Sequence, residues 1–193
     1  MKKKTAAGSL AVAWVAMAAA FTASAAEFDI WSRTINNDTN GVWHVQPDKP
    51  KPKDVKAPGV PGEMALRVKS RRGANPWDVQ ATSPIGGAIA AGDVVMVMAY
   101  LRAEQPAEGG SQLALRVQLA GAPYTSTMDF TAPITTEWKS YCAHRVATTE
   151  MPAGKSNVNV HLATAEQVID LGPVFVFNLG PGFDRTKLKG CDG

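Results

Sequence analysis

Residues 112–120 read "QLALRVQLA", and this stretch decides the fold class. Apolar and polar side chains alternate along it. Successive side chains of a β-strand point to opposite faces, so this alternation predicts a strand with one face in the core and one polar face. The core set is Leu113, Leu115, Val117 and Leu119, and the polar set is Gln112, Arg116 and Gln118.

The same alternation recurs in two other stretches. "NVNVHLAT" (157–164) places Val158, Val160 and Leu162 on one face, and its polar face carries Asn157, Asn159 and His161. "EMALRVKS" (63–70) predicts another half-buried strand, with Met64, Leu66 and Val68 on one side and Ala65, Arg67 and Lys69 on the other.

Other segments predict strands of different kinds. "DVVMVMAYLRA" (93–103) and "VFVFNLG" (174–180) are nearly continuous apolar runs, typical of central strands covered on both faces. Trp43 and Val45 predict a short strand in the otherwise irregular stretch 36–62. "NPWDVQ" (75–80) predicts a strand headed by Trp77, which we expect to anchor the core while Asp78 and Gln80 face the other way.

Turn signals rich in Gly and Pro separate these segments, among them "SRRGANP", "QPAEGGS" and "NLGPGFD". Short strands joined in this way, with almost no helical periodicity, indicate an all-β antiparallel sandwich or barrel and exclude a βαβ fold. We expect one domain, spanning residues 27–193, which is long enough to bury a real core.

Residues 1–26 are expected to be a cleaved signal peptide. Three lysines (Lys2, Lys3 and Lys4) precede the apolar run "GSLAVAWVAMAAAF", and the small residues "TASAA" follow. The apolar run is too short to span a bilayer comfortably. The sequence therefore predicts an exported protein, periplasmic or extracellular, with no membrane insertion after cleavage.

Charge and cysteine content narrow the function classes. Beyond residue 26, 17 basic residues balance 17 acidic ones, which argues against a nucleic-acid partner. Cys142 and Cys191 are the only cysteines of the chain. In an oxidising compartment such a pair is expected to form a disulfide that ties the C-terminal tail to the strand containing Cys142.

The order of five segments resembles the carbohydrate-binding modules of the CenC type, grouped as families four and nine. These segments are "NPWDVQ" (75–80), "IAAGDVVMVMAYLRAE" (89–104), "LRVQLAGAPYTS" (115–126), "TTEWKSYCAHRV" (135–146) and "VNVHLATAEQVIDLGPVFVFNLG" (158–180). The resemblance implies a galactose-binding-like β-sandwich (jelly roll) whose concave sheet holds a sugar chain. Such modules usually accompany polysaccharide-degrading enzymes, and we expect no catalytic domain on this chain.

The polar strand faces supply the candidate ligand-binding residues. Side-chain amides and guanidinium groups suit sugar hydroxyls because their donors and acceptors lie in a fixed plane. Tyr124, in "GAPYTS", could stack on a sugar ring or pack within its turn, and the polar faces could equally be ordinary solvated surface. The candidate residues are Gln80, Arg116, Gln118, Tyr124, Asn159 and His161.

No catalytic or metal site can be identified from the sequence. The carboxylates Glu63, Asp78, Glu137 and Asp170 could serve glycoside hydrolysis only if two of them converged on one bond, which spacing does not reveal. No cofactor is expected; Asp170 resembles an acid that binds structural calcium in some family members. The alternatives to sugar binding are a structural or protein-interaction module of the cell envelope, an accessory to a glycoside hydrolase, and an unrecognised hydrolase. Neither the sugar nor the oligomeric state follows from the sequence.

Overall fold

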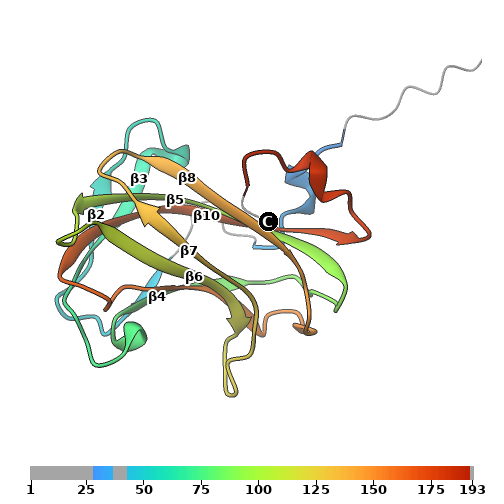
Figure 1. The fold of residues 1–193 in the computed structure, drawn as a ribbon, viewed down its shortest axis with the longest axis horizontal. Helices are drawn as coiled ribbons and strands as arrows, with labels where there is room; N and C mark the ends of the chain where they lie inside the picture. Colours follow the sequence, from blue (N-terminus) through green and yellow to red (C-terminus); the bar gives the residue numbers. More distant parts are fainter. Residues whose placement is uncertain (1–27, 37–42, 192–193) are drawn as a thin grey trace, which may run out of the picture.

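Two five-stranded antiparallel sheets pack face to face in a computed structural model that describes residues 28–36 and 43–191 (Figure 1). The expected signal peptide, residues 1–26, lies outside the described residues. The chain has the predicted all-β sandwich fold, and helical structure among the described residues is limited to short 3-10 turns. These are η1 (Trp31–Arg33), η2 (Pro61–Glu63), η3 (Pro76–Asp78) and η4 (Arg185–Lys187).

One sheet, called here the β6 sheet, has the strand order β1-β4-β9-β6-β7. Its strands are β1 (His44–Gln46), β4 (Gln80–Ile85), β9 (Ser156–His161), β6 (Ser111–Leu119) and β7 (Ser126–Ile134). The other, the β10 sheet, has the order β2-β3-β10-β5-β8. Its strands are β2 (Lys53–Lys56), β3 (Met64–Ser70), β10 (Gln167–Pro181), β5 (Asp93–Gln105) and β8 (Lys139–Val146).

The core lies between the two sheets and is built by the alternation predicted for β6 and β9. Leu113, Leu115 and Val117 of β6 are at most 1% exposed, and Val158 and Val160 of β9 are fully buried. The inward-facing residues of β5 and β10 meet them from the other sheet. Each strand of the β6 sheet therefore has one face in the core, which leaves its other face free for a site.

The apolar runs form the neighbouring strands β5 and β10, which are covered on both faces as predicted. Their outward-facing apolar side chains form a second cluster that includes Phe175 and Phe177. The indole of Trp31 packs edge-on against these two rings at centroid distances of 5.1 and 5.4 Å. Leu188, from the C-terminal segment, belongs to the same cluster. The N-terminal turn and the C-terminal tail thus shield the outer face of the central strands.

The face assignment predicted for residues 63–70 is partly wrong. Met64 is 49% exposed, whereas Ala65 is buried. Ala65 packs with Ala57 and Val60, which come from the connection between β2 and β3 and cover the outer face of the sheet at this point. A covering connection of this kind leaves no trace in the strand's own alternation.

The stretch predicted as a strand headed by Trp77 is instead a 3-10 turn, and β4 begins only at Gln80. The backbone N–H of Asn75 donates to Oδ2 of Asp78 at 2.9 Å, and Nδ2 of Asn75 donates to Oδ1 of Asp78 at 3.2 Å. Pro76 occupies the first position of the turn, where its fixed φ is favourable. These local contacts stabilise the turn against the extended conformation.

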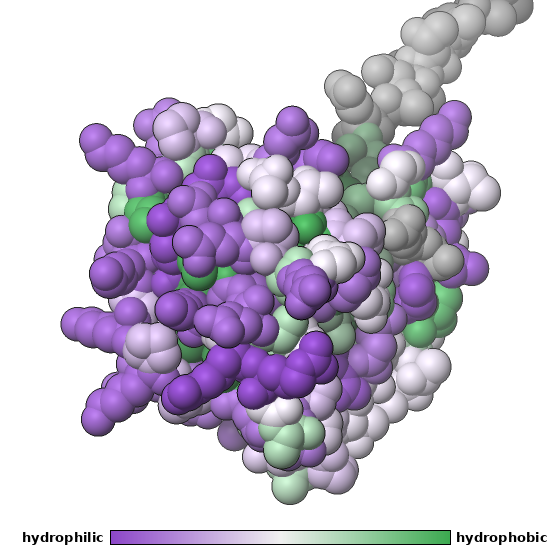
Figure 2. Space-filling model, turned by 60° about the vertical axis from the view of Figure 1, so that its left-hand side comes forward, coloured by the Kyte–Doolittle hydropathy of each residue, from purple (hydrophilic) through white to green (hydrophobic). Residues whose placement is uncertain are grey.

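The surface has no apolar belt on the face shown in Figure 2, where hydrophilic side chains predominate and apolar groups are scattered. Among residues 28–36 and 43–191, no helix has the length and hydrophobicity needed to cross a membrane.

The predicted disulfide between Cys142 and Cys191 is confirmed, with a Cα–Cα distance of 4.9 Å. It ties the C-terminal tail to β8 across a sequence separation of 49 residues. Replacing both cysteines by serine should lower the free energy of unfolding by about 4 kcal/mol in the chain-entropy model. Denaturant unfolding of the oxidised protein and the variant measures the difference. Equal stability of the two proteins would contradict the expected stabilisation by the bond.

Candidate functional site

A groove of about 740 Å³ lies on the outer face of the β6 sheet. Side chains from β1, β4, β9 and β6 form its floor, and residues from η3 and from the loop between β6 and β7 complete its lining. The floor residues are Gln46, Gln80, Thr82, Arg116, Gln118, Asn157, Asn159 and His161. The others are Trp77, Ala120, Pro123 and Tyr124.

Strand register aligns the floor residues in rows across the sheet. Gln46 pairs with Gln80, and Gln80 pairs with His161. In the next row Thr82 pairs with Asn159, which pairs with Arg116; the third row joins Asn157 to Gln118. Directly paired residues share a face and have Cβ atoms about 4.5–5.5 Å apart. The rows therefore form a continuous polar surface.

All six ligand-binding residues predicted from the sequence line this one groove: Gln80, Arg116, Gln118, Tyr124, Asn159 and His161. The polar face of the predicted strands is therefore a hollow rather than an evenly solvated sheet. Whether these side chains contact a sugar stays a prediction.

Trp77 does not anchor the core, contrary to the expectation. Its side chain is 53% exposed and lines the groove, and its ring meets the imidazole of His161 at a centroid distance of 5.9 Å in an edge-on arrangement. Gln80 lines the same groove, so the two residues do not face opposite ways. The turn at η3 is the reason, because it removes Trp77 from the alternation of β4. Asp78 is used locally, by Asn75.

Tyr124 lies at the other end of the floor. It belongs to the loop between β6 and β7, beside Pro123, and is 55% exposed. Its φ of 55° lies in the left-handed region, and its N–H donates to the carbonyl of Gly121 at 2.8 Å. The backbone closes this turn while the phenol stays accessible. Aromatic rings thus stand near the His161 row and near the Gln118 row.

The charge of the groove is nearly balanced. Arg116 forms an ion pair with Asp129 of β7, the next strand of the sheet. His161 is buried, and burial, followed by the charge of Arg116, lowers its pKa, with a smaller opposing effect of Asp129. None of the described groove residues is an aspartate or a glutamate. The site therefore presents polar groups with little net charge.

Hydrogen bonds satisfy only part of the polar floor. Nδ2 of Asn159 donates to Oε1 of Gln80 at 2.6 Å. Three buried side-chain oxygens of the floor have no hydrogen-bond partner among the described residues: Oε1 of Gln118, Oδ1 of Asn157 and Oδ1 of Asn159. Gln118 is 5% exposed and Asn159 is 2% exposed.

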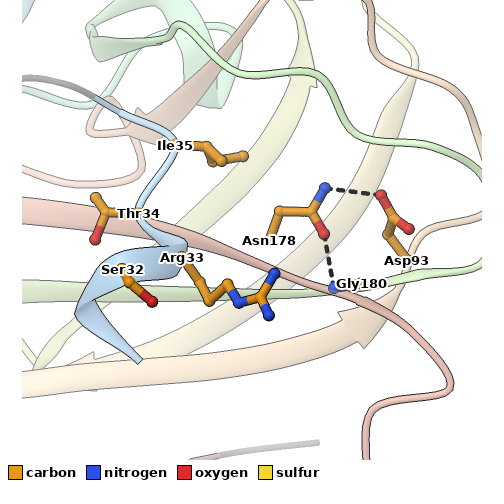
Figure 3. Close-up of a pocket in the computed structure, with 7 residues that line it drawn as sticks. All are labelled: Ser32, Arg33, Thr34, Ile35, Asp93, Asn178 and Gly180. Atoms are coloured by element: carbon orange, nitrogen blue, oxygen red, sulfur yellow. Dashed lines mark hydrogen bonds between the residues drawn. The ribbon is translucent and has the colours of Figure 1, made fainter. Parts of the chain in front are cut away.

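A second hollow, of about 360 Å³, lies between η1 and the start of β5 (Figure 3). Three of its lining residues are joined by hydrogen bonds. Nδ2 of Asn178 donates to Oδ2 of Asp93 at 2.7 Å, and the N–H of Gly180 donates to Oδ1 of Asn178 at 2.9 Å. The N–H of Ala90 also donates to Asp93, at 2.8 Å. This network fastens the start of β5 to the end of β10.

The Asp170 carboxylate, the candidate calcium ligand, is fully buried between two arginines. Arg67 donates to its Oδ1 at 2.7 Å, and Arg102 donates to its Oδ2 at 2.6 Å. Glu104 bridges the same two guanidinium groups. Both carboxylate oxygens are thus engaged by cations of the chain. Among the described residues no group of three or more His, Cys, Asp or Glu is arranged to hold a metal ion.

The four carboxylates considered for hydrolysis do not line the groove. Glu63 ends η2 and Glu137 lies between β7 and β8, both exposed. Asp78 caps η3, where hydrogen bonds from Asn75 lower its pKa, and Asp170 belongs to the buried ion pairs.

No protein-family model and no curated protein matches the chain. Solved structures do. The N-terminal cellulose-binding domain of Cellulomonas fimi β-1,4-glucanase C is 16% identical, with a TM-score of 0.54 over 72% of this chain and 91% of that one. The second N-terminal cellulose-binding domain of the same enzyme is 19% identical, with a TM-score of 0.53 over 79% and 95%. A structure described as CBM4 is 19% identical, with a TM-score of 0.50 over 59% and 83%.

The chain has the fold of CenC-type carbohydrate-binding modules. The resemblance stated from the sequence is therefore confirmed at the level of the β-sandwich. At these identities the binding residues of the solved structures cannot be assigned to positions of this CenC-like sandwich. The candidate site is therefore described from the geometry of this chain alone.

Sequence reasoning missed several groove residues. Asn157 lies on the polar face of its strand and lines the groove, but it is not among the six residues that the sequence predicts to bind a ligand. Its pairing with Gln118 is the signal that would have included it. Gln46 lies on a strand of three residues, too short for alternation to be read, and Trp77 was hidden by the turn.

Truncation to alanine should affect the stability of the protein strongly at Trp43 and weakly at Trp77. Trp43 is 7% exposed, and its Nε1 donates to the carbonyl of Gly172 at 2.7 Å. Trp43→Ala should cost about 3–5 kcal/mol of unfolding free energy, whereas Trp77→Ala should stay within about 0.5 kcal/mol of wild type. Denaturant unfolding measures both. A large loss of unfolding free energy for Trp77→Ala would contradict the exposed position of this side chain.

His161 should titrate below the ordinary histidine value of about 6.5. The folded state then binds fewer protons than the unfolded state, so this residue lowers stability as the pH falls through 6.5 toward the folded pKa. Between about pH 7 and pH 5, wild type should lose more stability than His161→Gln. NMR titration of the imidazole together with unfolding at each pH tests this. A midpoint at or above 6.5 would contradict it.

Proposed function

We propose that this protein binds a polysaccharide or oligosaccharide in the groove of the β6 sheet and does not transform it. The observation that carries the proposal is the convergence of amide, guanidinium, imidazole and exposed aromatic side chains in one hollow. The likeness of the fold to cellulose-binding domains supports the same conclusion.

The chemistry of the groove suits a sugar. Pyranose rings present apolar faces, which stack on aromatic rings, and hydroxyl edges, which hydrogen-bond to planar amides. Trp77 and Tyr124 supply the exposed rings, and the floor between them supplies the amides. Ligand sites elsewhere combine apolar and aromatic walls with a few placed polar groups in the same way.

Export is part of the proposal. We infer a periplasmic or extracellular location from the signal-peptide pattern of residues 1–26, and the Cys142–Cys191 disulfide supports an oxidising compartment. A carbohydrate in or beyond the cell envelope is the partner that this location makes accessible.

Replacing Arg116 and Gln118 together by Ala should weaken sugar binding. Each lost hydrogen bond costs about 0.5–1.5 kcal/mol, so the pair should reduce affinity at least several-fold. Affinity electrophoresis and calorimetry with soluble glucans, xylans and mannans measure the change. Gln112→Ala is the matched control, because Gln112 is an exposed residue of the same strand and lies outside the groove.

The outcomes separate the proposals cleanly. Equal binding by wild type and the folded double variant would place the site elsewhere. A wild type that binds nothing on the panel would favour the cell-envelope scaffold. Reducing ends released from any of the same polymers, and lost when one carboxylate is neutralised, would show a hydrolase instead.

A further inference from the structure

We infer that two arginines, Arg67 and Arg102, replace the structural calcium ion that the resemblance to CenC-type modules implies at Asp170. The residues around Asp170 do not fit a metal ion, and their contacts show which groups take its place. The sandwich therefore keeps its fold and stability without a divalent cation. The inference concerns the outer face of the β10 sheet, so its tests are independent of sugar binding in the groove.

Asp170 lies at the centre of a row that crosses three strands. Arg67 of β3 pairs with Asp170 of β10, and Asp170 pairs with Arg102 of β5. Residues paired directly in a sheet share a face. The neighbours of Asp170 along β10, Ile169 and Leu171, belong to the core between the sheets, so this row lies on the outer face. One guanidinium group therefore stands on each side of the carboxylate.

The carboxylate oxygens of Asp170 are fully used by these two arginines. Oδ1 accepts a hydrogen bond from Nε of Arg67 at 2.7 Å. Oδ2 accepts from Nη2 of Arg67 at 3.0 Å, and from Nε and Nη2 of Arg102 at 3.1 and 2.6 Å. An ionised carboxylate has about four lone-pair sites. A metal ion would have to displace a guanidinium group from each oxygen that it bound.

The remaining groups of the cluster do not supply a calcium site. Calcium takes six to eight oxygen ligands. The second carboxylate, that of Glu104, is used by the same arginines, at 3.1 Å from Arg67 and 2.8 Å from Arg102. Two guanidinium charges balance two carboxylate charges, so the cluster offers a divalent cation no excess of negative charge.

The arginines join the strands that a bound cation would join. Their hydrogen bonds to Asp170 connect β3 and β5 to β10, which lies between them. The indole of Trp138 holds the guanidinium of Arg102, whose Cζ lies 5.1 Å from the ring centroid, within the range of a cation–π contact. Asp170 is fully buried, and a buried carboxylate needs a compensating charge. The chain provides that charge itself.

Thermal unfolding with excess calcium or with EDTA is the first test. The Tm of the protein should agree within about 1 °C in the two conditions, because only a ligand that binds the folded state stabilises it. Sodium chloride of equal ionic strength is the control. A Tm more than about 3 °C higher in calcium than in this control would overturn the inference.

Metal content and NMR examine the cluster directly. After dialysis against calcium and then against metal-free buffer, elemental mass spectrometry should find no stoichiometric calcium. The Nε–H resonances of Arg67 and Arg102, assigned with Arg67→Lys and Arg102→Lys, should not move when calcium is added. One calcium ion retained per chain, or a saturable shift of both resonances, would overturn the inference.

Removal of both guanidinium groups is the third test. The double variant Arg67→Met/Arg102→Met keeps apolar stems and leaves the buried carboxylate without a compensating charge, so its Tm should fall by at least about 6 °C. Lys69→Met is the matched control, because Lys69 is an exposed cation of the same strand, and its Tm should stay within about 2 °C of wild type. A double variant as stable as this control would overturn the inference.

The single variants keep the test decisive if the double variant does not fold. Arg102→Met leaves Arg67 on both oxygens of Asp170, whereas Arg67→Met leaves Oδ1 without its Arg67 donor. Both should have a lower Tm than Lys69→Met, and Arg67→Met should have the lowest. Losses no greater than that of Lys69→Met in both single variants would contradict the role of the arginines.

Discussion

The antiparallel pairing of β6 with β9 is the constraint on which both the core and the groove depend. Val117 opposite Val158 and Leu115 opposite Val160 face the core, so Arg116 opposite Asn159 and Gln118 opposite Asn157 must face outward. A shift of one residue would turn every side chain of a strand to the other face. Burial of the apolar set therefore fixes the register, and the register aligns the polar set. The alignment of the polar residues on the outer face therefore follows from core packing.

The two sheets use their outer faces differently. The N-terminal turn and the disulfide-bonded C-terminal tail cover part of the outer face of the central strands of the β10 sheet. Farther along these strands, Arg67 and Arg102 form ion pairs with the buried carboxylate of Asp170. Removing both arginines would leave the buried Asp170 carboxylate without a compensating charge, which is far costlier than losing a surface ion pair. With that sheet covered, the open face of the β6 sheet is where a ligand can reach the strands.

The polar floor of the groove is only partly hydrogen-bonded. Three of the seven buried side-chain polar atoms that lack a hydrogen-bond partner among the described residues belong to the groove, and the other four lie elsewhere in the sandwich. The groove also exposes apolar surface, because the rings of Trp77 and Tyr124 lie exposed near opposite ends of its floor.

The resemblance to CenC-type modules selected a sandwich over a barrel. Alternation and composition predicted the half-buried and doubly covered strands, the polar strand faces and the disulfide. Each depends on local pattern or on a choice with few alternatives, such as two cysteines. Tertiary structure decided the rest. The order of strands within each sheet determined that the polar rows of β4, β9 and β6 are contiguous, and a capped turn moved Trp77 from the core to the groove. The β2–β3 connection covers Ala65, while Met64 is exposed. The strand order depends on contacts between segments far apart in the chain, whereas the turn at η3 and the β2–β3 connection are local features that the alternation within a strand does not encode.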